Sequence, residues 1–128
     1  MAAPSMTFNT AGNALASQSL ANAGTVTFNL DLSAKFEGQV EVKVVEGGTV
    51  AATAGVRVDV FAGYGSTPTY TTVNPNFTMT VPAGTATVTV YSPKIYLPTG
   101  KYQVKLTNLD ATNAVTVEAT MDTVDAVA

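Results

Sequence analysis

The sequence predicts an all-β protein, an antiparallel two-sheet β-sandwich with Greek-key connections and an extended N-terminal arm. After Gly24 the apolar and polar residues alternate with a period of two, which is typical of strands with one buried and one wet face. Val, Thr and aromatic residues dominate these runs, and turns rich in Gly, Pro and Asn separate them. The chain of 128 residues contains no Cys, so a packed core rather than disulfides must stabilise it. Immunoglobulin-like and jelly-roll topologies both use about this number of strands, and the pattern does not choose between them.

Each alternating run predicts one strand with a defined inner face. In the first run Val26, Phe28 and Leu30 face the core, and the polar residues between them face water. Later runs repeat the pattern with Val, Met, Tyr or Ala on the inner face. The predicted strands are residues 25–32, 37–45, 55–63, 76–81, 84–92, 101–108 and 114–122, with 94–97 as a short additional candidate.

The beginning of the chain differs from the rest, and we predict an arm at residues 1–24 ahead of one β-sandwich domain at residues 25–128. The first charged side chain is Asp31. Without a basic residue or an unbroken apolar run, the arm matches neither a secretory signal nor a membrane-spanning helix. A short helix over residues 13–23 is an open alternative, because its two ends carry suitable capping residues.

The arm has the composition of a segment that is buried on another protein. Disordered tails are usually charged, whereas this segment carries Met6, Phe8, Leu15 and Leu20 among small neutral residues. Met6 and Phe8 alternate with polar residues and would add as a strand to the edge of a partner's sheet. We therefore expect these four residues to bind a partner, with a disordered terminus as the alternative.

The last two runs are expected to pair as a hairpin around a loop at residues 110–113. This register places Lys105 opposite Glu118 and Lys101 opposite Asp122, so that both pairs have complementary charge. Because like charges directly opposite each other would destabilise a sheet, the pattern favours this register.

Tyr102 begins one of these strands, within the stretch LPTGKYQVKL. The stretch resembles the tyrosine corner of immunoglobulin-like and fibronectin-like sandwiches, in which a Tyr hydroxyl bonds back to upstream backbone. The resemblance implies the same bond for Tyr102, and a plain core aromatic is the alternative.

The composition argues against catalysis, nucleic-acid binding and membrane binding. The chain has no His and no Cys, so the usual general base, the thiolate nucleophile and the commonest metal ligands are missing. Six basic residues are scattered through a chain of net charge −3, which suits neither phosphate backbones nor anionic membranes. We expect no enzyme activity, no catalytic residues and no cofactor. The acidic side chains are expected on the wet faces of separate strands, too dispersed for a paired-carboxylate site: Asp31, Glu41, Asp59, Glu118 and Asp122.

Two loops contain the candidate ligand-binding residues. Asn108, Asp110 and Asn113 offer the oxygen ligands that calcium prefers, but they are equally typical of a turn, and we expect a turn and no metal. Tyr64 and Tyr70 lie in a long loop from which exposed rings would stack on a sugar. Packing of both rings beneath their own loop is the alternative.

The stretch TFNLDLSAKFEGQVEVKVVEGGTVAATAGVRVDVFAGYG, at about residues 26–65, resembles small β-sandwich virion proteins of tailed bacteriophages, including capsid decoration (cement) proteins. The resemblance implies a role on the outside of the head, where a homo-oligomer, with a trimer favoured, binds the major capsid protein and bridges its subunits. It also implies assembly in the host cytoplasm and offers no catalytic residues to carry over. A tail or fibre component is the nearest variant, and a carbohydrate-binding or adhesion module is the alternative function.

Overall fold

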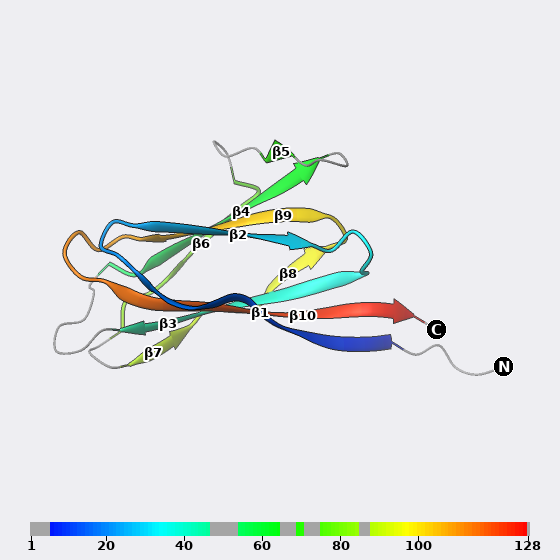
Figure 1. The fold of residues 1–128 in the computed structure, drawn as a ribbon, viewed down its shortest axis with the longest axis horizontal. Helices are drawn as coiled ribbons and strands as arrows, with labels where there is room; N and C mark the ends of the chain where they lie inside the picture. Colours follow the sequence, from blue (N-terminus) through cyan, green and yellow to red (C-terminus); the bar gives the residue numbers. More distant parts are fainter. Residues whose placement is uncertain (1–5, 47–53, 65–68, 71–74, 85–87, 128) are drawn as a thin grey trace.

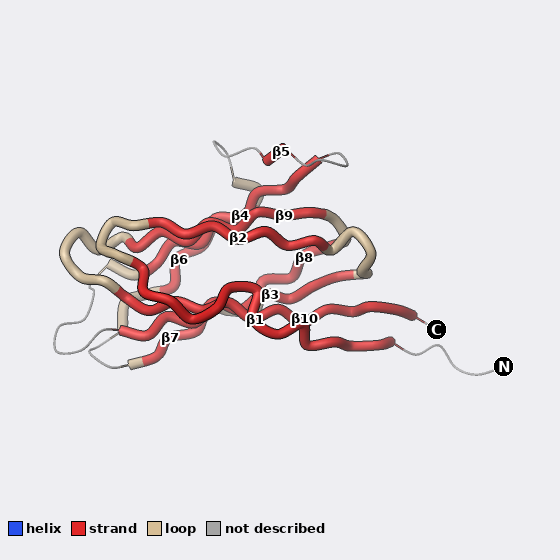
Figure 2. The backbone as a smooth tube through the Cα atoms, viewed as in Figure 1, coloured by secondary structure: helices blue, strands red, loops and turns tan. Residues whose placement is uncertain are grey.

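The computed structural model describes residues 6–46, 54–64, 69–70, 75–84 and 88–127, and in these ranges the chain forms strands and connecting loops (Figure 2). Two antiparallel sheets of five strands each lie in two layers (Figure 1). This arrangement confirms the predicted all-β, two-sheet β-sandwich. In the described part of the chain, no helix has the length and hydropathy to span a membrane.

The strands of the first sheet are β1 (Met6–Leu20), β3 (Glu37–Glu46), β7 (Thr89–Tyr91), β8 (Ile95–Pro98) and β10 (Val115–Val127). Their order is β1-β10-β3, and β7 and β8 both pair with the far edge of β3. The strands of the second sheet are β2 (Thr25–Asp31), β4 (Val56–Tyr64), β5 (Thr69–Tyr70), β6 (Phe77–Val81) and β9 (Lys101–Asn108). Their order is β2-β9-β4, and β5 and β6 both pair with β4. Every predicted run overlaps one of these strands, and the short candidate is β8.

The strand pairing is nested, which identifies the topology. β1 pairs with β10, β2 with β9, β3 with β8, and β4 with β6. A chain that is folded into one long hairpin and then rolled up has this order, which is the jelly-roll topology. The structure therefore selects the jelly roll from the two topologies that the sequence left open. As a result, each of the steps β1 to β2, β2 to β3 and β3 to β4 crosses from one sheet to the other.

The hydrophobic core lies between the two sheets and is formed by the predicted inner faces. Val42, Val58 and Val104 are typical members, each fully buried. Position 38 is on the inner face of β3 and is occupied by Gly. A Cβ at this position would lie 2.8 Å from Cδ1 of Leu32. Leu32 is itself fully buried, so its side chain occupies the space that any larger residue at position 38 would need.

The beginning of the chain departs from the expected arm. Residues 6–20 are neither a projecting arm nor a helix but the strand β1, which pairs along its length with β10 of the same chain. Leu15 and Leu20 are buried in the core of the sandwich. The physical reason is that β10 needs a second neighbour and the core needs apolar side chains at that edge. In the structure the sandwich therefore includes residues that were expected to lie before its boundary at residue 25.

The expected hairpin register is wrong, because β9 and β10 belong to different sheets. Lys105 lies opposite Thr27 on one side and Asp59 on the other, and Glu118 lies opposite Lys43. Lys105 and Glu118 therefore each lie opposite a residue of opposite charge, but on a different strand from the one expected. Charged residues occur at alternate positions on several strands, so charge matching between two neighbouring runs did not identify the true partners.

Tyr102 makes the bond that the tyrosine-corner resemblance implies. Its hydroxyl donates a hydrogen bond to the backbone oxygen of Pro98, with an O–O distance of 2.9 Å. Pro98 ends β8 in the first sheet and Tyr102 is near the start of β9 in the second, so the bond fixes the turn that crosses between the sheets. Burial raises the pKa of the Tyr102 hydroxyl above its usual value.

We predict that Leu20→Ala lowers the free energy of unfolding by about 2–5 kcal/mol, because Leu20 is only 4% exposed and its removal leaves a cavity in the core. Urea denaturation followed by circular dichroism measures the change. The matched control is Ser19→Ala at the neighbouring exposed position, which should change the free energy by less than about 0.5 kcal/mol. Equal stability of Leu20→Ala and the wild type would show that β1 is not part of the folded core.

We predict that Tyr102→Phe lowers the free energy of unfolding by about 0.5–1.5 kcal/mol at neutral pH through loss of the bond to Pro98. Because the folded pKa of Tyr102 is raised, its contribution is complete below the unfolded value, about pH 10, and is lost as the pH rises through the folded value. Denaturation series from neutral to alkaline pH should therefore show a steeper alkaline loss in the wild type than in Tyr102→Phe. The exposed Tyr96 provides the control, since Tyr96→Phe should keep the wild-type slope.

Candidate functional site

The four expected partner-binding residues of the first segment separate into two groups. Leu15 and Leu20 pack into the core of their own chain, so they are structural residues here. Met6 and Phe8 lie in β1, where their backbones are opposite Val127 and Val124 of β10. Their binding to a partner stays a prediction.

The two tyrosines expected to bind sugars lie at one end of the second sheet. Tyr64 ends β4 and Tyr70 lies in β5, and the two strands pair with Gly63 opposite Tyr70. The Tyr70 side chain is half-buried. Residues 65–68 and 71–74 of the expected loop lie outside the described residues, so the role of this loop stays a prediction.

β1 is the outermost strand of the first sheet on its side, and in the described chain it pairs with β10 alone. It is long, contains no charged residue and no Pro, and has four register irregularities along its pairing with β10. The side chains of residues 16–19 are exposed. The outer edge of β1 is therefore a neutral backbone edge available to another strand.

Beyond the sandwich, β1 and β10 continue together as a two-stranded ribbon. β3 begins at Glu37, opposite Val124, so in the described chain the rest of β10 pairs only with the start of β1. Figure 1 shows this ribbon projecting past the other strands at the end where both termini lie. Phe36 lies at the same end, where its N–H donates to the Val124 oxygen while its ring is largely exposed.

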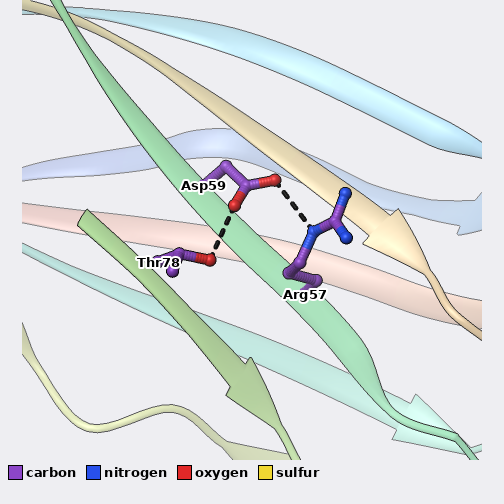
Figure 3. A network of polar contacts seen from close by, with 3 residues as sticks. All are labelled: Arg57, Asp59 and Thr78. Atoms are coloured by element: carbon purple, nitrogen blue, oxygen red, sulfur yellow. Dashed lines mark hydrogen bonds and ion pairs between the residues drawn. The ribbon is translucent and has the colours of Figure 1, made fainter. Parts of the chain in front are cut away.

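One acidic side chain expected on a wet face is buried. Asp59 on β4 is only 6% exposed and accepts hydrogen bonds from the hydroxyl of Thr78 on β6, at 2.7 Å, and from Nε of Arg57, at 3.0 Å. Figure 3 shows the Asp59 carboxylate between the Thr78 hydroxyl on one side and the Arg57 guanidinium on the other. The bond from Thr78 joins β4 to β6 and the ion pair with Arg57 lies within β4, so both carboxylate oxygens are occupied and we assign Asp59 a structural role. Asp31 is exposed as expected, and hydrogen bonds from the hydroxyl and N–H of Ser33 lower the pKa of its carboxyl.

The candidate calcium loop is a turn built around a buried amide. Asn108 is only 1% exposed, and its Nδ2 donates to the backbone oxygens of Ala21, at 3.2 Å, and Asn113, at 2.9 Å. The Oδ1 atom of Asp110 accepts from the backbone N–H groups of Thr112 and Asn113. These oxygens therefore serve the turn itself. Among the described residues no three acidic side chains come together in a metal-binding group.

The buried Asn108 side chain also joins two loops, a role that the sequence pattern did not reveal. The loop after β1 and the loop after β9 both cross between the sheets at this end, and the Asn108 amide bonds to both. The Ala23 N–H also donates to the oxygen of Asp110, and Asn22 Nδ2 donates to the oxygen of Ala111. The buried amide thus holds the two crossing loops together.

Neither a protein-family model nor a curated protein sequence matches this chain. Solved structures with similar folds include a chain in the structure of infectious bursal disease virus, strain Gx, with a TM-score of 0.52 and 15% identity over 95% of this chain and 32% of that one. Tailspike protein 4 of bacteriophage CBA120 has a TM-score of 0.53 and 8% identity over 93% of this chain and 18% of that one. A family 35 carbohydrate-binding module from Cellvibrio japonicus has a TM-score of 0.48 and 17% identity over 84% and 70%.

These similarities concern the fold. The chain spans about a third of the length of the matched infectious bursal disease virus chain and less than a fifth of the tailspike chain. A viral protein, a phage tailspike and a carbohydrate-binding module are thus among the structural neighbours of this jelly roll, all at low sequence identity.

We predict that Asn108→Asp lowers the free energy of unfolding by about 2 kcal/mol or more near neutral pH, because a carboxylate would replace the donor that faces two backbone oxygens. At acidic pH the new Asp side chain should be protonated, and part of the lost free energy of unfolding should then be recovered. The control is Asn113→Asp, whose side chain bonds only to the exposed Thr112 hydroxyl. If the loop binds calcium, Asn108→Asp would instead be stabilised by millimolar calcium more than the wild type is.

Proposed function

We propose that the protein is a non-catalytic structural component of a bacteriophage virion, a decoration protein on the outside of the head that bridges subunits of the major capsid protein. The proposal combines the resemblance of residues 26–65 to such proteins with one structural observation. That observation is the long, uncharged edge strand β1.

The case for β1 as the attachment site comes from how sheet edges are usually protected. An exposed edge presents unpaired N–H and C=O groups, and most proteins protect it with charged residues, Pro or very short strands. Among the described strands, the opposite edge of the first sheet is formed by β7, of three residues, and β8, of four, which ends in Pro98. β1 has fifteen residues, no charge and no Pro, and its irregular register with β10 is the one feature of this strand that resembles such protection. A partner strand would pair its backbone groups without burying an unpaired charge.

The ribbon and Phe36 would extend the contact from the exposed residues 16–19 of β1 to the other end of this strand. A two-stranded ribbon is marginally stable alone in water, and a further strand or a partner surface would stabilise it. The exposed ring of Phe36 next to β10 would add an apolar contact there. One molecule would thus contact a capsid subunit through backbone pairing and through a single aromatic side chain.

The jelly roll behind this edge would act as a rigid connector. Each copy contributes modest binding energy, but a homotrimer that engages several capsid subunits at once would gain avidity, since later contacts become intramolecular. Such clamping would help the shell to resist internal pressure from packaged DNA. No catalytic group is needed for this function.

We predict that Gln18→Lys weakens binding to heads at least about tenfold, because the new charge on the exposed part of β1 would be buried without a partner. Co-sedimentation of the purified protein with heads that lack it, from the phage that encodes it, measures the affinity. The matched control is Thr89→Lys on the opposite edge of the same sheet, at another exposed position.

The control should bind as the wild type does, and both variants should keep the wild-type free energy of unfolding within about 0.5 kcal/mol. Equal binding by Gln18→Lys and the wild type would exclude residues 16–19 of β1 from the attachment site. Failure of the wild-type protein to bind heads at all would overturn the proposed function.

A further inference from the structure

We infer that the outer face of the first sheet binds a neutral oligosaccharide, across Tyr91 and Tyr96 and the hollow beside them. Neither tyrosine belongs to the loop around Tyr64 and Tyr70 that the sequence indicated. The inference is independent of β1, which lies at the other edge of the sheet.

Tyr91 and Tyr96 are large aromatic side chains on the same face. Tyr91 lies opposite Lys43 and Tyr96 opposite Gln39, and both of these β3 residues point outward because Val40, Val42 and Val44 point into the core. The two rings are 54% and 65% exposed. Aromatic rings exposed to this extent offer flat apolar faces on which sugar rings can stack.

The spacing of the two tyrosines fits a chain of sugars. Their partners on β3 are four residues apart, which corresponds to about 13 Å along the strand. A single sugar ring does not span this distance, whereas an oligosaccharide does. The site should therefore prefer a chain of several rings to a monosaccharide.

Between the rings the edge of the sheet is interrupted, which opens a hollow. β7 ends at Tyr91 and β8 begins at Ile95, and Ser92 bridges the gap by exchanging hydrogen bonds with the backbone of Val42. Lys94 follows on the exposed side of this bridge. The hollow has a volume of about 140 Å³ and is lined by Gln39, Val40, Glu41, Lys94, Thr120 and Asp122.

The groups that line this hollow suit hydroxyl-rich neutral ligands. Glu41 and Asp122 accept hydrogen bonds, Lys94 donates them, and Gln39 and Thr120 do both. Two carboxylates against one ammonium group disfavour an anionic ligand such as a phosphate. Apart from Val45, the outward β3 and β10 positions of this face from Gln39 to Lys43 and from Thr116 to Asp122 are polar, so it lacks the broad apolar centre of a typical protein interface. Flat rings beside mixed donors and acceptors are the chemistry that recognises sugars.

The test is binding to immobilised cellohexaose, xylohexaose, maltohexaose, mannohexaose and neutral bacterial O-antigen polysaccharide, followed by calorimetry with any glycan that binds. We expect at least one to bind, and the corresponding monosaccharide to compete poorly. Since the chain has no Trp, a change in tyrosine fluorescence provides a second measure of binding. Tyr96→Ala and Tyr91→Ala should each weaken binding about tenfold, and Tyr96→Phe should retain it.

Two controls separate this site from other surfaces. Phe77→Ala removes an exposed ring from the second sheet and should leave binding unchanged. Tyr70→Ala tests the loop that the sequence indicated and should also leave it unchanged. Gln18→Lys, which tests head binding through β1, should bind the glycan as the wild type does. Binding to none of the glycans, or binding lost in Tyr70→Ala and kept in Tyr96→Ala, would overturn the inference.

Discussion

The pairing of β1 with β10 is the constraint on which the rest of the structure depends. It closes the outermost layer of the nested pairs, gives β10 its second neighbour and brings Leu15 and Leu20 over the core. It also fixes where the two crossing loops meet, and there the buried amide of Asn108 joins them. A strand pair that is distant in sequence therefore determines the local geometry at both of its ends.

The sequence predicted the parts of the fold that depend on local pattern. A period of two reveals which residues of a strand face the core, so Val42, Val58 and Val104 were correctly placed. The Tyr102 bond was predictable because its acceptor, Pro98, is only four residues away. The same pattern does not reveal which strands pair. Lys105 has an acidic residue opposite it in the structure as well as in the rejected hairpin, so charge alone did not distinguish them.

The residues of the candidate sites were harder to predict for a related reason. Asp59 alternates with buried valines and looks exposed, yet Thr78 and Arg57 enclose it once β6 pairs with β4. Tyr91 and Tyr96 fall in two separate predicted strands, residues 84–92 and the short candidate 94–97, whose partners the sequence did not indicate. Only the pairing of both strands with β3 places their rings on one face. The proposed attachment edge and the proposed sugar-binding face thus both result from strand order, and they lie toward opposite edges of one sheet.

The nested topology also has a consequence for biosynthesis. While the ribosome is still translating residues 115–127, β1 has left the exit tunnel but its partner does not yet exist. During this interval Leu15, Leu20 and the neutral edge of β1 are open to other nascent chains on the same messenger, a setting in which strands of identical sequence are concentrated. Emergence of residues 115–127, rather than of any earlier segment, is therefore the step that commits this molecule to its native sheet.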